Sequence, residues 1–298
     1  MSAFNRRSTA EQVTEGLDLS GKTILITGVN SGLGYESMRV LAMRGAHIIG
    51  CARTIEKALE ACDSVDGQTT AIACELSDPA SVNQCADTVI AMGAPIDALL
   101  CNAGIMALME HQKAHGLEMQ FLTNHIGHFL LIQRLLGLLQ EAGKSRVVLT
   151  SSGGHTHTVA GGIDFANLSG DNQYDAWKFY GQSKLANILC ANGIASRYKD
   201  RGITANSVHP GVIQTNLARN AGGLMTKVIQ LFAPLFSRSI AQGAATQCYL
   251  AVNPECESVS GEYFADCNPA KPSKYALDKG LANRLWERSE KIIAEFDG

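Results

Sequence analysis

The chain has 298 residues, of which 46% are hydrophobic and 18% charged, so a large buried core is possible and wholesale disorder is excluded as the default. Lys plus Arg number 25 against 28 Asp plus Glu, a net charge of −3 that argues against a dedicated nucleic-acid-binding protein. No apolar run reaches the ~18 residues of a membrane-spanning helix, and the start M-S-A-F-N-R-R lacks the apolar core of a signal peptide, so we expect a soluble, cytoplasmic protein without a membrane anchor.

The cysteines point to the same kind of compartment. There are nine of them, an odd number, and no C-x-x-C pair occurs. Both features argue against a disulfide scaffold or a structural zinc site. We expect reduced, buried cysteines that pack as small hydrophobic side chains.

Residues 1–20 are polar and have no sustained period, so we expect a lead-in segment there. Strand-like runs follow that are apolar on both faces, as in a parallel sheet covered on each side. They are T-I-L-I-T-G from Thr23, H-I-I-G-C-A from His47, T-T-A-I-A-C-E-L from Thr69, I-D-A-L-L-C-N from Ile96, S-R-V-V-L-T-S-S from Ser145 and G-I-T-A-N-S-V from Gly202.

Segments with helical periodicity lie between these runs. The clearest cover residues 34–44, 79–92, 115–141 and 176–198, and Asp78 before Pro79 is a good helix cap. Alternating strands and helices predict an α/β fold of right-handed crossovers. We therefore expect one Rossmann-type, doubly wound parallel sheet with helices on both faces, formed by a single domain over residues 21–298.

The first strand ends in T-G-V-N-S-G-L-G, residues 27–34, directly before a helix. Glycines allow the tight turn and the close approach of a pyrophosphate, and the helix start presents amides to the phosphates. A glycine triplet alone is equally typical of a structural turn, but its place after the first strand favours dinucleotide binding. The expected loop residues are Gly28, Asn30, Ser31, Gly32, Leu33 and Gly34.

Further motifs follow in chain order: C-N-A-G at 101–104, N-H-I-G-H-F at 124–129, V-V-L-T-S-S at 147–152, Y-G-Q-S-K at 180–184 and H-P-G at 209–211. Together with T-G-x-x-x-G-x-G they resemble the short-chain dehydrogenase/reductase family over about residues 20–265. The long gap between Ser152 and Tyr180 is most similar to the retinol-dehydrogenase-like branch. The resemblance implies a nicotinamide dinucleotide and an oxidoreductase.

The end of the second strand bears on the coenzyme. No acid for a ribose 2′-hydroxyl stands at residues 45–55, whereas Arg53 can grip a 2′-phosphate, unless it is a solvated surface arginine. We therefore expect NADP(H), with NAD(H) less favoured. Two positions depart from the family pattern, Glu75-Leu76 in place of Asp-Leu and Cys101 in place of the first asparagine of N-N-A-G. By the resemblance, Glu75 and Leu76 lie near the adenine, and Asn102, Ala103 and Gly104 form a wall against the adenosine.

Tyr180 and Lys184 are four residues apart on a predicted helix and so share one face. A nearby ammonium stabilises a phenolate, so we expect it to lower the pKa of Tyr180 and make it the acid/base group. The resemblance adds Lys184 as a ligand of the nicotinamide ribose. It also adds Ser152, rather than its rival Ser151, on the substrate oxygen, and Asn124 in a helix kink that serves the proton relay. It places Pro210, Gly211, Val212 and Thr215 along the nicotinamide.

Two other features have weaker interpretations. His125 with His128, and His155 with His157, are spaced like metal ligands but lack a third partner, and we expect no metal. Within residues 216–237, Gly222 and Gly223 offer a hinge, and the residues after them form an apolar set. We expect a lid over an apolar substrate there, the alternatives being a helix packed on the core or a subunit or membrane contact.

The sequence therefore predicts an NADP(H)-dependent oxidoreductase that interconverts an alcohol and a ketone or aldehyde on an apolar, medium-sized substrate. The alternative is a catalytically silent protein that senses the dinucleotide or acts as a scaffold. That alternative is less favoured because Ser152, Tyr180 and Lys184 are all present. By the resemblance we also expect a homodimer or homotetramer, joined through the helices at 115–141 and 176–198.

Overall fold

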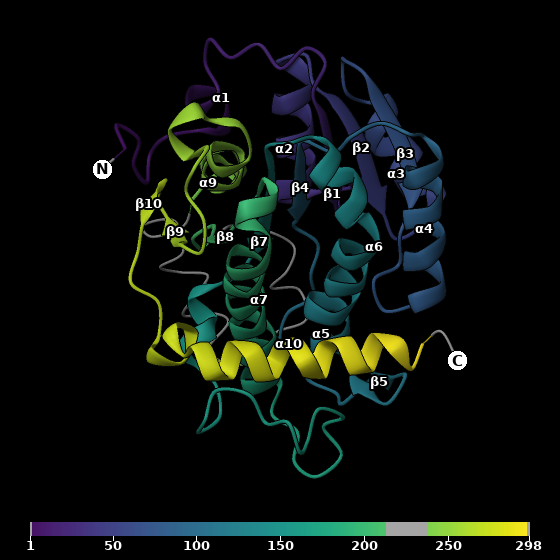
Figure 1. The fold of residues 1–298 in the computed structure, drawn as a ribbon, viewed down its shortest axis with the longest axis vertical. Helices are drawn as coiled ribbons and strands as arrows, with labels where there is room; N and C mark the ends of the chain where they lie inside the picture. Colours follow the sequence, from purple (N-terminus) through teal and green to yellow (C-terminus); the bar gives the residue numbers. More distant parts are fainter. Residues whose placement is uncertain (1, 213–237, 297–298) are drawn as a thin grey trace.

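The computed structural model describes residues 2–212 and 238–296, which are built around one eight-stranded sheet (Figure 1). The strand order is β10-β9-β8-β7-β4-β1-β2-β3, and every neighbouring pair is parallel except β9 with β10. The strands are β1 Thr23–Thr27, β2 His47–Ala52, β3 Thr69–Ala73, β4 Ala98–Cys101, β7 Ser145–Thr150, β8 Ile203–His209, β9 Tyr263–Ala265 and β10 Asn268–Pro269. The six predicted strands and the doubly wound order are thus confirmed. The two short strands at one end of the sheet, β9 and β10, were not predicted, since they have only three and two residues.

Each central strand buries both of its faces. In β1, Ile24 and Ile26 join one apolar cluster and Leu25 the other. The first cluster is completed by buried side chains of α1 Ala10–Val13, α2 Gly32–Met43, α3 Ile55–Asp63 and α9 Ile240–Val252. The second is completed by α4 Pro79–Ala91, α6 Gly127–Glu141, α7 Ala176–Tyr198 and α10 Lys279–Ala294. Two helical layers therefore cover the sheet, which explains the continuous apolar runs.

Two predicted helices fit the structure closely. The helix expected at 176–198 is α7. That expected at 79–92 is α4, and Asp78 caps it by accepting from the Ala80 amide at 3.1 Å. All nine cysteines are unpaired and buried, as predicted. Within the described residues, no helix combines the length and apolarity required to cross a membrane.

The helix expected at 115–141 begins later than predicted. His115 and Gly116 have φ of +50° and +73° and form the turn of a small hairpin, β5 Lys113–Ala114 and β6 Leu117–Glu118. Such angles are incompatible with a right-handed helix. The helical part starts with α5 Met119–Phe121, passes through a π-helical turn at Leu122–Ile126 and continues as α6. This turn bears on the site because it contains Asn124.

The first twenty residues are more than a lead-in. Ala10 and Val13 of α1 are fully buried in the first apolar cluster. The segment is tied to β10 because the Asn268 side chain donates to the Phe4 carbonyl at 2.9 Å and accepts from the Ser2 amide at 3.0 Å. The polar sequence hides this role because only two residues of a four-residue helix face the core.

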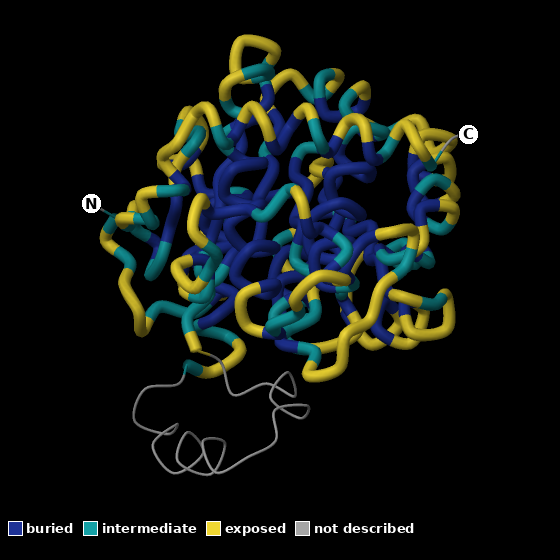
Figure 2. Tube along the Cα trace, turned by 90° about the horizontal axis from the view of Figure 1, so that it is seen from below, coloured by how far each residue is buried: buried dark blue, intermediate teal, exposed yellow. Residues whose placement is uncertain are grey.

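Helix α10 lies across α7 (Figure 1). Figure 2 shows that the buried segments of the chain lie in the interior. Sixteen of the 23 residues of α7 are buried within the chain itself. Trp286 of α10 packs edge-on against Phe129 of α6, with ring centroids 4.9 Å apart, and the Arg197 guanidinium of α7 lies 4.4 Å from the Trp286 ring. Helix α10 thus packs on part of α7, one of the two helices predicted to join subunits.

Candidate active site

Most of the predicted loop residues follow the carboxyl ends of four adjacent strands, β1, β4, β7 and β8, while Tyr180 and Lys184 lie on α7. The chain order reverses direction between β1 and β4, and ligands of open parallel sheets bind at such a switch point. The motifs that the sequence separates by up to 180 residues therefore meet along one edge of the sheet.

The loop after β1 has the shape that a phosphate requires. Gly28 and Gly32 have φ of +75° and +60°, a region that favours glycine. A Cβ on Gly34 would lie 2.2 Å from the Gly28 carbonyl oxygen, so a side chain there would displace the turn. Helix α2 begins at Gly32, and Ser31 caps it without a side-chain hydrogen bond. Asn30 and Ser31 are exposed and Leu33 is half-buried. These residues fit a dinucleotide, whose pyrophosphate the amides of the helix start would hold.

Thr27 ties this loop to two other parts of the site. Its Oγ1 accepts from the amides of Asn102 and Ala103 at 3.0 and 3.1 Å, and lies 2.9 Å from Nε2 of His128. His128 Nδ1 lies 3.0 Å from the Asn124 carbonyl oxygen, which can only accept, so Nδ1 donates and Nε2 accepts from the Thr27 hydroxyl. From the sequence, we considered His128 only as a metal ligand. The i,i+4 spacing between Asn124 and His128 was the signal that could have predicted this hydrogen bond.

The side chain of Asn102 holds the glycine loop from the other side. Its amide group donates to the Thr27 carbonyl at 2.9 Å, and Gln247 donates to its Oδ1 at 3.3 Å. A Cβ on Gly104 would lie 2.9 Å from Asn124 Oδ1 and 3.2 Å from Lys184 Nζ. Gly104 is therefore the point at which the adenosine wall meets the catalytic residues.

The predicted coenzyme-selecting residues meet at the ends of β2 and β3. Arg53 Nε lies 3.1 Å from Glu75 Oε2, and the two side chains are 65% and 30% exposed. The other carboxylate oxygen of Glu75 accepts from the amide and hydroxyl of Ser77 at 3.0 and 2.8 Å. Arg53 and Glu75, which stands in place of the family's aspartate, thus form one ion pair. Leu76, by contrast, is buried, and its carbonyl lies against Gly127.

Tyr180 and Lys184 lie on the side of α7 that faces β7. Lys184 is 4% exposed, donates from Nζ to the Thr150 carbonyl at 3.1 Å, and lies 5.8 Å from the centre of the Tyr180 ring. Burial lowers the pKa of Lys184 to about 8. Burial also raises the pKa of Tyr180, and a hydrogen bond from Ser152 opposes that rise. The predicted lowering by Lys184 is therefore not found, because desolvation of the phenol dominates.

The two serines after β7 have different surroundings. The hydroxyl of Ser151 is buried and donates to the Lys184 carbonyl at 2.8 Å, so it fastens α7 to the sheet. Ser152 is half-buried, accepts from the Gly154 amide at 3.1 Å, and its Oγ would lie 3.5 Å from a Cβ on Gly154. A Cβ on Gly154 would lie 2.9 Å from the Tyr180 ring. The geometry therefore favours Ser152 over its rival.

Asn124 lies in the π-helical turn, where the family resemblance had placed a kink. Its amide donates to the Ile105 carbonyl and to the Ser183 hydroxyl, both at 2.9 Å, and its Oδ1 accepts from the Ile105 amide at 2.8 Å. The side chain is thus fully used in joining α7 to the segment after β4. Its backbone carbonyl accepts from His128 Nδ1 at 3.0 Å.

The segment after β8 reaches the same edge. Gly211 has a φ of +90°, and a Cβ there would lie 2.5 Å from Arg238 Nε. Arg238 donates to the Pro210 carbonyl at 3.3 Å and from its amide to the Val212 carbonyl at 2.9 Å, and it forms an ion pair with Asp266. Thr215 and the predicted lid at 216–237 lie outside the described residues.

The histidine pairs have structural partners. Burial lowers the pKa of His125 to about 3 and that of His128 to about 4, and His125 Nε2 lies 2.9 Å from the Ser289 hydroxyl of α10. In the described part of the chain, no group of three His, Cys, Asp or Glu side chains is arranged to hold a metal ion.

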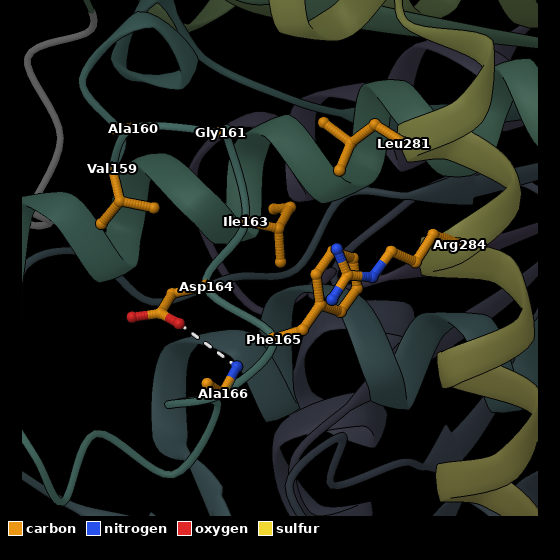
Figure 3. A pocket seen from close by; sticks show the side chains of 9 residues that line it. All are labelled: Val159, Ala160, Gly161, Ile163, Asp164, Phe165, Ala166, Leu281 and Arg284. Atoms are coloured by element: carbon orange, nitrogen blue, oxygen red, sulfur yellow. Dashed lines mark hydrogen bonds between the residues drawn. The ribbon is translucent and has the colours of Figure 1, made fainter.

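A cavity of about 390 Å³ lies between the loop at 159–166 and α10 (Figure 3). The Arg284 guanidinium lies over the Phe165 ring, 4.2 Å from its centre, and Asp164 is turned away and accepts from the Ala166 amide at 3.2 Å. None of its lining residues is among those predicted for catalysis or coenzyme binding. We therefore do not include this cavity in the candidate active site.

Comparisons with known proteins agree with this geometry. The family described as short chain dehydrogenase matches residues 22–223. The chain is 40% identical to the short-chain dehydrogenase TIC 32 A, chloroplastic, of Brassica napus over 98% of this chain and 95% of that one. It is 36% identical to retinol dehydrogenase 12 of Mus musculus over 94% and 89%. An uncharacterised protein from Mycobacterium paratuberculosis has a similar structure, with a TM-score of 0.77, 31% identity and coverage of 95% and 97%.

Proposed function

Because this chain belongs to the short-chain dehydrogenase/reductase family and is an oxidoreductase of alcohols and carbonyls, we propose that it uses NADP(H) and acts on an apolar, medium-sized substrate. The observation that carries the proposal is the meeting of Ser152, Tyr180 and Lys184 beside the glycine loop after β1. A protein that only bound the dinucleotide would have no use for a buried lysine and tyrosine on the substrate side.

The proposed chemistry divides the work between coenzyme and protein. A bound nicotinamide dinucleotide would supply or accept the hydride. In reduction, the Tyr180 hydroxyl gives its proton to the substrate oxygen, and in oxidation it takes that proton back. Ser152 donates a hydrogen bond to the same oxygen and so holds it beside Tyr180.

Lys184 has a role that its burial makes possible. With a pKa lowered to about 8, its ammonium can lose and regain a proton near neutral pH. We propose that it returns the proton that Tyr180 gives away, and that it binds the nicotinamide ribose, as the family resemblance implies. Asn124 fixes the neighbouring backbone, and His128 and Thr27 couple that backbone to the coenzyme loop.

The preference for NADP(H) rests on Arg53. Its side chain is 65% exposed at the end of β2, where the family holds the adenosine ribose, and no acid accompanies it on that strand. A guanidinium has several donors for a 2′-phosphate. Glu75 forms an ion pair with the same guanidinium, so its carboxylate would compete with the 2′-phosphate for part of that contact.

The apolar nature of the substrate has two supports near the catalytic residues. Trp177 is 44% exposed, and its ring lies 6.3 Å from that of Tyr180. Val212 is 62% exposed at the end of the segment after β8. The sequence of residues 216–237 is a further support, although these residues lie outside the described part of the chain.

The deciding experiment is a panel of aldehydes and ketones with NADPH, followed by the nicotinamide absorbance. It should pair apolar carbonyls of increasing length with polar sugar carbonyls as matched controls. We expect turnover of apolar compounds, with kcat/KM at least about tenfold above that of the sugars. Tight NADPH binding without turnover of any compound would contradict the proposal and favour the dinucleotide-binding scaffold.

A further inference from the structure

The peptide group that joins Ser152 to Gly153 is held at both ends by histidine rings. Its carbonyl oxygen accepts from Nδ1 of His155 at 2.7 Å, and its amide donates to Nδ1 of His209 at 3.1 Å. His155 comes from the loop after β7, whereas His209 is the last residue of β8. The turn after β7 and the end of β8 thus contribute one ring each to the backbone of a predicted catalytic residue.

The partners of His155 determine where its proton lies. The Ser152 carbonyl oxygen can only accept, so Nδ1 carries the proton. The Ser273 backbone amide, 3.0 Å from Nε2, can only donate, so Nε2 is bare. The ring is 2% exposed and packs against Tyr263, with ring centres 5.0 Å apart. Both contacts therefore require the same neutral tautomer, with the proton on Nδ1.

His209 requires the opposite tautomer. Its Nδ1 lies 3.1 Å from the Gly153 amide and 3.4 Å from the Gly211 amide, and both amides are donors. Nδ1 must therefore be bare, and the proton of the neutral ring lies on Nε2. Burial and the charges of Arg238 and His155 lower the pKa of His209 to about 4, and Asp266 opposes them.

We propose that His155 and His209 are positioning residues that clamp the Ser152–Gly153 peptide and so aim the Ser152 hydroxyl at the substrate oxygen. This inference rests on the proposed role of Ser152. The peptide cannot rotate without breaking a hydrogen bond at one end or the other. The Gly154 amide also donates to Ser152 Oγ at 3.1 Å, so the backbone and the side chain of Ser152 are both held, and the hydroxyl keeps its own proton to donate to the substrate oxygen.

The clamp works only while both rings are neutral. A second proton would fall on Nε2 of His155, against the Ser273 amide, or on Nδ1 of His209, against the amides of Gly153 and Gly211. Burial lowers the pKa of His155 as well, so both rings are neutral at pH 7. The titratable and charged groups that face them are Tyr263 for His155, Arg238 and Asp266 for His209, and each ring for the other.

Matched variants test the clamp by its hydrogen bonds. His155→Asn keeps a donor, and His209→Asn keeps an acceptor, at the position of Nδ1, whereas His155→Leu and His209→Leu keep neither. We expect each leucine variant to lose about ten- to a hundredfold in kcat, since small misplacements of reacting groups have such effects. The dissociation constant of NADPH should stay within about threefold, and the asparagine variants should recover most of kcat. Leucine variants with unchanged kcat, or asparagine variants as poor as leucine, would overturn the clamp.

A second measurement needs no activity and no variant. Long-range ¹H–¹⁵N NMR of the ¹⁵N-histidine-labelled protein distinguishes the two neutral tautomers of each ring. We expect His155 with its proton on Nδ1, His209 with its proton on Nε2, and neither titrating between pH 6 and 7 as free histidine does, at about 6.5. Opposite tautomers, or titration near 6.5, would overturn the inference even if leucine variants failed to fold.

The NMR measurement, combined with the turnover of Ser152→Ala, distinguishes a failure of this inference from a failure of the proposed function. If Ser152→Ala keeps the wild-type kcat while the tautomers are as inferred, the proposed role of Ser152 fails and the clamp has nothing to aim. If Ser152→Ala loses activity but the tautomers differ, the proposed function stands and the clamp is wrong.

Discussion

The two ends of the candidate site are built in opposite ways. At the catalytic end, Tyr180 and Lys184 are 8% and 4% exposed, and Lys184 Nζ and the Ser151 hydroxyl each donate to a backbone carbonyl. At the adenosine end, Arg53 and Glu75 are 65% and 30% exposed and meet in one ion pair. Both ends lie at the carboxyl edge of the parallel sheet, so the strand ends alone do not explain the difference.

The difference lies in how much water surrounds the charges. At the buried end, losing a single proton or hydrogen bond costs much free energy, because no water replaces the lost partner. In the exposed end, water screens each interaction, and an ion pair is worth ~0–1 kcal/mol. We therefore expect changes at the catalytic end to abolish turnover, and changes at the adenosine end to tune the choice of coenzyme.

The largest expected effect follows from Tyr180→Phe. Loss of general acid/base catalysis costs ~10²–10⁴ in rate, and kcat should fall by at least about a hundredfold. The dissociation constant of NADPH, measured by fluorescence titration, should stay within a few-fold, because the phenol acts on the substrate. Tyr249→Phe, which removes a hydroxyl bonded to Glu255, is the control and should keep kcat. A Tyr180→Phe enzyme with more than about a tenth of wild-type turnover would refute the assignment.

The next effect is on stability and has the opposite sign from the effect on activity. Lys184→Met should be inactive yet raise the free energy of unfolding at pH 7 by ~1–3 kcal/mol, since it removes a desolvated ammonium. The Thr150 carbonyl keeps a partner because Asn187 also donates to it at 3.0 Å.

The lowered pKa of Lys184 also determines how the free energy of unfolding changes with pH. The folded-state pKa of Lys184, about 8, lies below the unfolded value of 10.5, so wild-type stability should rise from pH 8 to 10.5. The advantage of Lys184→Met should be full below about pH 8 and should shrink through that window. Urea unfolding at several pH values measures it, with the exposed Lys178→Met as control. A destabilised Lys184→Met protein at pH 7 would contradict this account of burial.

Arg53→Ala should have an intermediate effect on coenzyme choice. A charge-assisted contact with a 2′-phosphate is worth ~1.5–3 kcal/mol, so the wild type should prefer NADPH over NADH by at least about tenfold in kcat/KM. The variant should lose most of that preference through weaker use of NADPH, with NADH nearly unchanged. Arg134→Ala, at another arginine paired with an aspartate, is the control. If Arg53→Ala kept the wild-type ratio, Arg53 would be an ordinary surface residue.

The smallest effect is expected for Glu75→Gln. It removes the ion pair with Arg53 and a negative charge near the expected 2′-phosphate, while its amide can still reach Ser77. We expect NADPH to bind about two- to fivefold more tightly, the range of an exposed ion pair, with little change for NADH. Isothermal titration with both coenzymes measures it. Weaker binding of NADPH would mean that Glu75 orients Arg53 more than it competes with the phosphate.

Most of the candidate site could be predicted because its residues lie in short local motifs. The glycines after β1, Tyr180 with Lys184 one helical turn apart, and Ser152 at the end of β7 each follow from local geometry and spacing. The apolar runs likewise predicted the parallel sheet, since strands buried on both faces need such runs. One local signal misled us: the apolar period through His115 predicted a helix, but the positive φ of His115 and Gly116 delays its start to Met119.

Only the tertiary structure decided the contacts between residues far apart in the chain. Arg53 meets Glu75 because β2 and β3 are neighbours, and His209 reaches Gly153 because β8 pairs with β7. The sequence likewise left open the helix α10 across α7 and the dominance of burial over the Lys184 charge at Tyr180. Strand order and desolvation depend on the whole packed chain, whereas turn geometry and helical spacing depend on a few neighbouring residues. For this protein, the sequence therefore determined which groups form the candidate site, and the packing determined how each of them is held.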